Sequence, residues 1–293
     1  MADATRYLIL RLIPLLLVIA QAGPAFGRQP GDPSRSAFES TMAVAAAEQW
    51  SDLPLGDVMQ RVGLRFIGRP YEAGLLDAPE SETLVAPLDR FDCVLFVEAV
   101  LAISRGIVAG DPSHDGYLRR VEEQRYRDGT MNGYCSRLHY FSEWIADNES
   151  RGLVTNITSG IGGQVLAKRL TFMGRNRSSY RQLATNDSLF AGIQAMERDL
   201  ADLEIHYVPK AAIRRTYGSL RAGDIVALAT SIDGLDVVHT GLVYDAGDGR
   251  KGLLHASLTR GVVVSPDLQS YVENNRSQIG IVVARPTDGR AGH

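Results

Sequence analysis

Residues 92–104 constrain the fold of this chain more than any other segment. Wound as a helix, the segment is apolar on nearly every side and carries one carboxylate, Glu98, among its apolar residues. A helix that is apolar all round is buried rather than amphipathic, so we expect it at the centre of a folded domain. Asp92 is well placed to cap the helix start, because its carboxylate can accept from free backbone N–H groups there. A buried Glu98 needs a polar partner, which the sequence does not identify.

Cys93 lies in the first turn of this predicted helix. The free N–H groups and the helix dipole at that end favour a thiolate, which is the nucleophilic form of cysteine. Two histidines follow far downstream on strand-like segments, His239 in DVVHTGLVYD and His255 in GLLHASLT. A cysteine followed at long range by histidine is typical of a cysteine-nucleophile site. A single histidine on a strand is more often structural than catalytic, but two of them on adjacent strands together with a cysteine at a helix start favour catalysis. We therefore predict Cys93 as nucleophile, His239 as base and His255 as the group that orients the base.

Cys93 and Cys135 are the two cysteines of the chain. In an exported protein two cysteines ordinarily form a disulfide, and in that alternative Cys93 is structural. The position of Cys93 at a helix start, together with its candidate histidine partners, favours a reactive thiol instead. Cys135 lies in a turn-like segment, and the sequence leaves its pairing open.

Residues 1–27 have the features of a secretory signal peptide. Arg6 and Arg11 supply positive charge, residues 12–20 are apolar, and small residues stand at 25 and 27, where a signal peptidase reads the chain. The apolar run is short of the roughly 20 residues that a membrane span requires, and an uncleaved anchor is the alternative. We predict a periplasmic or secreted protein with no membrane span after signal cleavage. A formal net charge of −3 argues against a nucleic-acid partner.

The rest of the chain is predicted to form a single catalytic domain at 38–286, between a flexible leader at 28–37 and a tail at 287–293. Helical patterns cover 38–50 and 55–67, and a mostly helical insert covers about 106–220. Beyond it, five segments rich in β-branched residues predict an antiparallel meander: 224–228, 237–244, 252–258, 261–264 and 278–284. Helices followed by strands indicate the α+β class.

The sequence contains no familiar metal or nucleotide motif. HExxH and CxxC are absent, and so are the Walker and dinucleotide glycine patterns. The glycines at 160–163 lack the lysine and the acidic partner that such sites need. We therefore predict no metal and no cofactor.

Five segments, in this order, resemble a known family: PYEAGLL (70–76), FDCVLFVE (91–98), LRAGDIVAL (220–228), HTGLVYD (239–245) and LLHAS (253–257). They are similar to the NlpC-type papain-like cell-wall hydrolases, and more narrowly to their N-acetylmuramoyl-L-alanine amidase-like branch. That branch has an FDC(V/T)xFVE core and an inserted helical region with an Arg-x-x-Tyr-x-x-x-Trp-like segment, which is 137–144 here. The wider superfamily has Ser-Gly after the cysteine, where this chain has Val94-Leu95.

The resemblance implies a papain-like (NlpC-type) α+β fold. Such a fold has N-terminal helices, a buried helix carrying the nucleophile, a helical insert and a C-terminal antiparallel sheet or open barrel. The resemblance also implies Cys93, His239 and His255 as catalytic residues, with Tyr71 near the thiol.

We predict a cysteine amidase that cleaves the N-acetylmuramoyl to L-alanine bond of peptidoglycan or muropeptides. In the insert, Arg137 is expected to pair with a substrate carboxylate, and Tyr140 and Trp144 to stack on a sugar; ordinary helix packing is the alternative for all three. Two further functions stay open: a γ-D-glutamyl-diaminopimelate endopeptidase with the same chemistry, and a non-catalytic cell-wall binding protein.

Overall fold

The computed structural model describes residues 32–288. The predicted signal peptide at 1–27 lies outside these residues, as does most of the predicted tail. The flexible leader predicted for 28–37 is wrong in its second half, because the first helix begins at Pro33. Asp32 caps this helix by accepting from the backbone N–H of Ser34, and proline is favoured in a first helical turn because it has no N–H to leave unpaired.

The helices of the described part are concentrated in its first two thirds. They are α1 (Pro33–Ala47), α2 (Leu55–Arg65), α3 (Cys93–Val108), α4 (His114–Arg125), α5 (Phe141–Ser150), α6 (Phe172–Arg175), α7 (Arg181–Ala184), α8 (Asp187–Asp199) and α9 (Leu268–Glu273). Short 3-10 turns connect several of them.

The strands of the described part form one antiparallel sheet with the order β2-β3-β8-β4-β5-β6-β7, and β1 also pairs with β8. They are β1 (Val154–Asn156), β2 (Gln164–Val165), β3 (His206–Pro209), β4 (Ile225–Thr230), β5 (Val237–Asp245), β6 (Lys251–Ser257), β7 (Gly261–Ser265) and β8 (Gln278–Pro286). The chain therefore has the mixed helix and antiparallel-sheet architecture that the sequence predicts.

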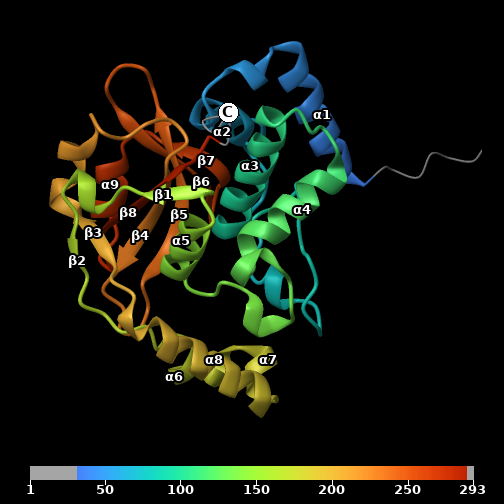
Figure 1. Ribbon diagram of the computed structural model, residues 1–293. Helices are drawn as coiled ribbons and strands as arrows, with labels where there is room; N and C mark the ends of the chain where they lie inside the picture. The colour runs from blue at the N-terminus through green and yellow to red at the C-terminus, as the bar shows by residue number, and fades with distance from the viewer. Residues whose placement is uncertain (1–31, 289–293) are drawn as a thin grey trace, which may run out of the picture. The chain divides into compact units, whose positions relative to one another are not determined.

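The predicted helix around Cys93 is confirmed as α3. It begins at Cys93 and continues to Val108, four residues beyond the predicted end. Figure 1 shows α3 with the sheet on one side and α4 on the other, and α2 also packs against it. Apolar residues all round the helix are buried in these contacts, which is the reason it needs no polar face.

The sheet is covered on both faces, so alternate residues of a strand enter different cores. In β4, Ile225 and Ala227 pack in the core that contains α2 and α3. Val226 and Leu228 pack in a second core with α9. This alternation follows from the two-residue period of a strand, and it explains why β4 reads as a continuous apolar run.

Two predictions about the sheet need correction. The segment after β7 does not continue a meander, since α9 carries the chain back across the sheet and β8 pairs with β4. The insert at about 106–220, predicted to be mostly helical, also contains strands that the sequence analysis did not assign, because β1 and β3 pair with β8 and extend the same sheet. Both misses concern pairing between distant segments, which local sequence patterns do not record.

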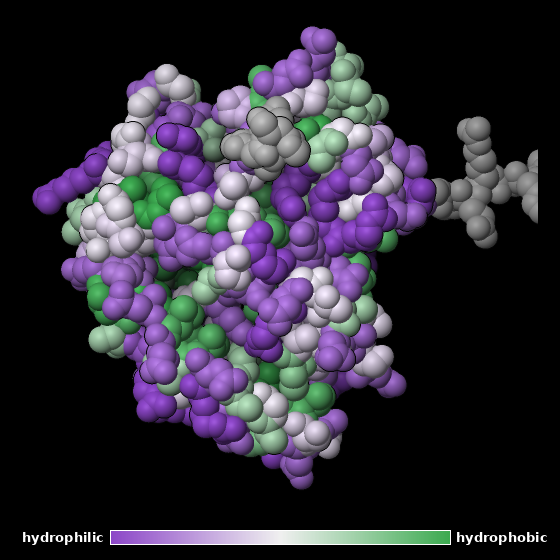
Figure 2. All heavy atoms as spheres, viewed as in Figure 1, coloured by the Kyte–Doolittle hydropathy of each residue, from purple (hydrophilic) through white to green (hydrophobic). Residues whose placement is uncertain are grey.

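No helix within residues 32–288 combines the length and the apolar character needed to cross a bilayer. Figure 2 shows one face of the molecule, on which hydrophilic side chains predominate and hydrophobic ones lie in separate patches. That face offers no single broad apolar area of the kind that marks a docking surface.

Candidate active site

The backbone around the start of α3 holds the Cys93 thiol against β5. Asp92 caps the helix, and its carboxylate accepts from the N–H of Leu95 at 2.8 Å, as the sequence predicts. Thr240 of β5 donates its hydroxyl to the carbonyl of Cys93 at 2.9 Å. Hydrogen bonds from Thr240 also reach the sulfur and lower the pKa of the Cys93 thiol. The half-buried thiol therefore lies beside the residue that follows His239 in the chain.

The expectation that the helix start favours a thiolate does not hold in this structure. Burial, and after it the negative charge of Asp92, raise the pKa of Cys93 to about 11, and the bonds from Thr240 offset this only in part. A helix dipole contributes at most about 2 kcal/mol even in partly buried positions. Desolvation and a carboxylate one residue away outweigh it, so the resting thiol is neutral.

The two predicted histidines lie together on neighbouring strands. Nε2 of His239 on β5 is 2.8 Å from Nδ1 of His255 on β6, and the two rings are nearly perpendicular with centroids 4.9 Å apart. Gly241 makes this approach possible, because a Cβ at that position would lie 2.9 Å from the Cβ of His255. Burial lowers the pKa of His239 to about 4 and is the main reason that the pKa of His255 falls to about 3. Both imidazoles are therefore neutral near pH 7.

Cys93 is connected to the strand of His239 through Thr240, the residue after His239, which bonds to the Cys93 carbonyl. Among the hydrogen bonds within residues 32–288, none joins the Cys93 sulfur to His239. Nε2 of His239 is occupied by His255, which leaves Nδ1 as the ring nitrogen free to accept a proton from the thiol. A long or absent contact before substrate binds is common for catalytic pairs and does not exclude one.

Three residues of this neighbourhood escaped the sequence analysis. Thr240 bonds to Cys93, and Ser265 of β7 lies 3.1 Å from Nε2 of His255 through its hydroxyl. The ring of Tyr271 on α9 packs against the ring of His255, with centroids 4.8 Å apart. The centroid of the His239 ring is 6.1 Å from that of Tyr271. Thr240 follows the predicted base His239 directly, and this position in the sequence could have pointed to it. Tyr271 lies on α9, a helix that the sequence analysis did not predict.

Tyr71 lies near the thiol, where the family resemblance places it. Its segment pairs with Phe91 in a short bridge, and the N–H of Phe91 donates to the carbonyl of Pro70 at 3.1 Å. The pKa of the Tyr71 hydroxyl is raised by burial first, then by the charge that Cys93 carries when it is a thiolate, and by the charge of Asp92. Tyr71 is therefore a neutral hydrogen-bonding group close to Cys93.

The other predicted substrate-binding residues do not lie on an open surface. Trp144 is buried and stacks on Phe141, and its indole N–H donates to Glu98 at 3.2 Å. Tyr140 is also buried, with its hydroxyl donating to Glu197 at 2.7 Å. A ring enclosed in this way has no face free for a sugar, so their predicted stacking role does not fit this structure.

Arg137 is likewise committed to the protein itself. Only 4% of the residue is exposed, and its guanidinium donates to the carbonyl of Leu76 at 2.8 Å and to the carboxylate of Asp77 at 2.5 Å. The guanidinium therefore ties the insert to the loop before α3, and pairing with a substrate carboxylate would require breaking these contacts.

Cys93 and Cys135 are both free thiols in the structure. The Cys135 sulfur lies against the carbonyl of Leu189 at 3.6 Å. The alternative in which a disulfide makes Cys93 structural therefore finds no support here.

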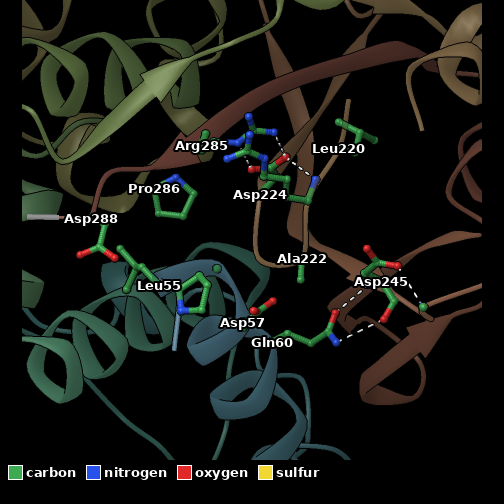
Figure 3. Close-up of a pocket in the computed structure, with 14 residues that line it drawn as sticks. Leu55, Asp57, Gln60, Leu220, Ala222, Asp224, Asp245, Arg285, Pro286 and Asp288 are labelled. Atoms are coloured by element: carbon green, nitrogen blue, oxygen red, sulfur yellow. Dashed lines mark hydrogen bonds and ion pairs between the residues drawn. The ribbon is translucent and has the colours of Figure 1, made fainter. Parts of the chain in front are cut away.

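One well-formed cavity of the described residues is separate from the thiol. It has a volume of about 660 Å³ and lies between the start of α2 and the ends of β5 and β8. Figure 3 shows two pairs of its polar residues bound to each other: Arg285 binds Asp224 through two 2.8 Å contacts, and Gln60 bonds to the backbone of Asp245. Neither Cys93 nor a histidine lines this cavity, so the chemistry assigned to the thiol does not take place there.

Comparison with known proteins identifies relatives of the chain. Residues 61–281 match the AmiA-like family, described as N-acetylmuramoyl-L-alanine amidase-like, whereas no curated protein matches. The chain is similar to a solved N-acetylmuramoyl-L-alanine amidase from Bacteroides uniformis, with 33% identity and a TM-score of 0.75 over 80% of this chain and 99% of that one.

Two further structures are similar. One, from Bacteroides fragilis, carries a name that suggests a xylanase; it is 34% identical, with a TM-score of 0.67 over 76% of this chain and 98% of that one. A Legionella pneumophila protein is 17% identical, with a TM-score of 0.63 over 86% of this chain and 95% of that one, a likeness in fold alone.

Proposed function

Because the chain belongs to the N-acetylmuramoyl-L-alanine amidase-like family, we propose that it cleaves the amide bond between N-acetylmuramic acid and L-alanine in peptidoglycan or muropeptides, with Cys93 as the nucleophile. The observation that carries the proposal is the pair His239–His255, 2.8 Å apart, on strands next to a thiol at a helix start. A thiol, a base and a group that orients the base are the parts that cysteine amide hydrolysis requires. The arrangement fits the papain-like, NlpC-type mechanism.

The neutral resting state decides how the thiol attacks. With the pKa of Cys93 near 11 and that of His239 near 4, the proton stays on sulfur until substrate arrives. As the sulfur bonds to the carbonyl carbon of the lactyl group, Nδ1 of His239 takes the proton. His255 accepts from Nε2–H of His239 and stabilises the imidazolium that forms.

Collapse of this intermediate breaks the amide bond. His239 delivers its proton to the nitrogen of L-alanine, which leaves as a free amine, and the lactyl group stays on Cys93 as a thioester. Water then attacks the thioester, with His239 taking a proton from it, and releases the muramic acid carboxylate and the thiol. The backbone N–H of Cys93 at the helix start is a donor for the oxyanion, and one such donor is typically worth roughly 10²–10³ in rate.

Peptidoglycan lies outside the cytoplasm, so the proposed substrate and the signal-like residues 1–27 together support a periplasmic or secreted location. The same machinery would also serve a γ-D-glutamyl-diaminopimelate endopeptidase, so the bond itself needs a direct test.

The test uses a defined muropeptide, N-acetylmuramoyl-tetrapeptide, and the matching bare tetrapeptide, with products weighed by mass spectrometry. The proposal predicts free N-acetylmuramic acid and a peptide beginning with L-alanine from the first substrate, and no cleavage of the second. Release of an L-Ala-D-Glu dipeptide from either substrate would assign the endopeptidase instead. Binding of muropeptide without any cleavage would favour a cell-wall binding protein.

A further inference from the structure

His255 is fully buried and both of its ring nitrogens have a partner. Nδ1 faces Nε2 of His239 at 2.8 Å, and Nε2 faces the hydroxyl of Ser265 at 3.1 Å. Ser265 is 5% exposed. Among the hydrogen bonds of residues 32–288, Ser265 provides the one side-chain partner of His255 Nε2. The residue ends β7, which pairs with β6 so that Leu253 lies opposite Ser265.

The ring nitrogen of His255 that carries the proton determines whether His239 can act as a base. A neutral imidazole carries one N–H, and the other nitrogen accepts. If His255 holds its proton on Nε2, its Nδ1 accepts from Nε2–H of His239, and Nδ1 of His239 is left as an acceptor for the thiol proton. If His255 holds its proton on Nδ1, the direction reverses: Nε2 of His239 accepts, Nδ1 carries the proton, and the base is blocked.

We propose that Ser265 is a positioning residue that selects the productive tautomer of His255 by accepting a hydrogen bond from its Nε2–H. The inference rests on the proposed function, since it assigns a role within the same site. The hydroxyl acts on His239 only through His255 and does not touch the reacting atoms.

The groups around His255 favour a ring with a single proton, which must lie on one of its two nitrogens. Apart from His239 on β5, they are Arg260 in the turn between β6 and β7 and Tyr271 on α9. Burial is the main obstacle to a second proton on His255, and the charge of Arg260, or of His239 once it is protonated, opposes that proton further. The ring therefore stays singly protonated, with its proton on either Nδ1 or Nε2, and the Ser265 hydroxyl favours Nε2 when it acts as the acceptor.

The experiment compares Ser265→Ala with Ser265→Thr, which keeps the hydroxyl. Ser104→Ala is the matched control, because Ser104 is also buried and its hydroxyl has no hydrogen-bond partner within the described residues. Nitrogen-15 NMR of histidine-labelled protein reads which ring nitrogen of His255 is protonated and needs no substrate. Steady-state kinetics on the muropeptide give kcat and KM separately.

We expect Nε2 of His255 to be protonated in the unmodified protein, in Ser104→Ala and in Ser265→Thr, and a mixture of tautomers in Ser265→Ala. The alanine variant should lose kcat by about 3- to 10-fold, the range that one neutral hydrogen bond spans, with KM unchanged and threonine restoring the rate. An unchanged tautomer in Ser265→Ala, or an Nδ1 proton in the unmodified protein, would overturn the inference. A tautomer shift in a protein that cleaves no muropeptide would instead contradict the proposed function and leave the role of Ser265 intact.

Discussion

Nε2 of His239 lies 2.8 Å from Nδ1 of His255, so the two imidazoles form a chain that leaves only Nδ1 of His239 for the thiol. The residues are 16 apart in sequence, and the hairpin of β5 and β6 brings them together. This relationship gives the two histidines unequal roles and makes the site testable one residue at a time.

Replacing Cys93 with alanine should abolish amide hydrolysis and leave the fold intact. In the proposed mechanism the thiol forms the covalent intermediate, and the half-buried side chain is small, so the truncation removes little packing. Cys135→Ala is the matched control and should keep full activity, because that thiol lies outside the site. Muropeptide turnover and circular dichroism are measured on both variants, and turnover by purified Cys93→Ala would remove Cys93 from the mechanism.

His239→Ala should reduce kcat by about 10²–10⁴, the usual contribution of a general acid–base group. His255→Ala should cost less, because an orienting group supports the base without taking the proton from the thiol. Steady-state rates on one muropeptide measure both. Equal, near-complete activity in the two variants would exclude the proposed pair.

The rate at which Cys93 is alkylated should depend on pH as expected for a thiol with an unusually high pKa. The thiolate reacts and the thiol does not, so the rate with iodoacetamide should rise with pH towards a midpoint near 11, the pKa that burial and Asp92 impose. Asp92→Asn removes the negative charge but keeps a good helix cap, so its midpoint should be lower. Peptide mapping separates Cys93 from Cys135, and a midpoint for Cys93 below 8 in the unmodified protein would contradict the neutral resting pair.

Acid should destabilise the protein below about pH 6.5, where an unfolded histidine takes up a proton. Folded His255 and His139 resist protonation, since burial is the main cause that lowers the pKa of each to about 3. The unfolded state therefore binds more protons, and the free energy of unfolding falls as pH drops from 6.5 towards 3. Urea titrations at pH 7 and pH 5 should show the loss, with a smaller loss in His139→Phe; an identical pH dependence in that variant would exclude its contribution.

The start of α3 was predictable because several local signals agree there. An acidic cap at Asp92, the run that follows Cys93 and the absence of a polar face each indicate the same buried helix. The five C-terminal strands were also predictable, since β-branched runs between turn residues are local patterns. The sequence order of Cys93, His239 and His255 was enough to nominate the residues that the fold brings to one region.

Features that depend on distant partners were not predictable. The aromatic residues of the insert suggest a sugar-binding surface by composition. Trp144 is instead enclosed and donates to Glu98, and no local pattern links residues 46 positions apart. The prediction of a thiolate at Cys93 failed for a similar reason. A helix start is visible in sequence, whereas the burial that raises the pKa of Cys93 is a property of the assembled fold.

The buried ion pair between Glu98 of α3 and Arg125 of α4 yields the last prediction. Nε of Arg125 donates to the Glu98 carboxylate at 2.7 Å, and both residues are almost fully buried. Burial alone would lower the pKa of Arg125, but the charge of Glu98 outweighs it and raises that pKa. Breaking a buried pair leaves a charge without a partner and costs about 3–5 kcal/mol, so Glu98→Gln should lower the free energy of unfolding by that order.

Arg105 and Glu123 provide a matched control between the same two helices. They form a partly exposed pair at 2.7 Å, and exposed pairs are worth about 0–1 kcal/mol. Glu123→Gln should therefore change the urea midpoint little. The double replacement Glu98→Leu with Arg125→Met should recover much of the loss, because apolar side chains of similar volume can replace a buried ion pair. Equal stability of Glu98→Gln and Glu123→Gln would show that burial of the pair does not govern how α3, the helix that carries Cys93, is held in place.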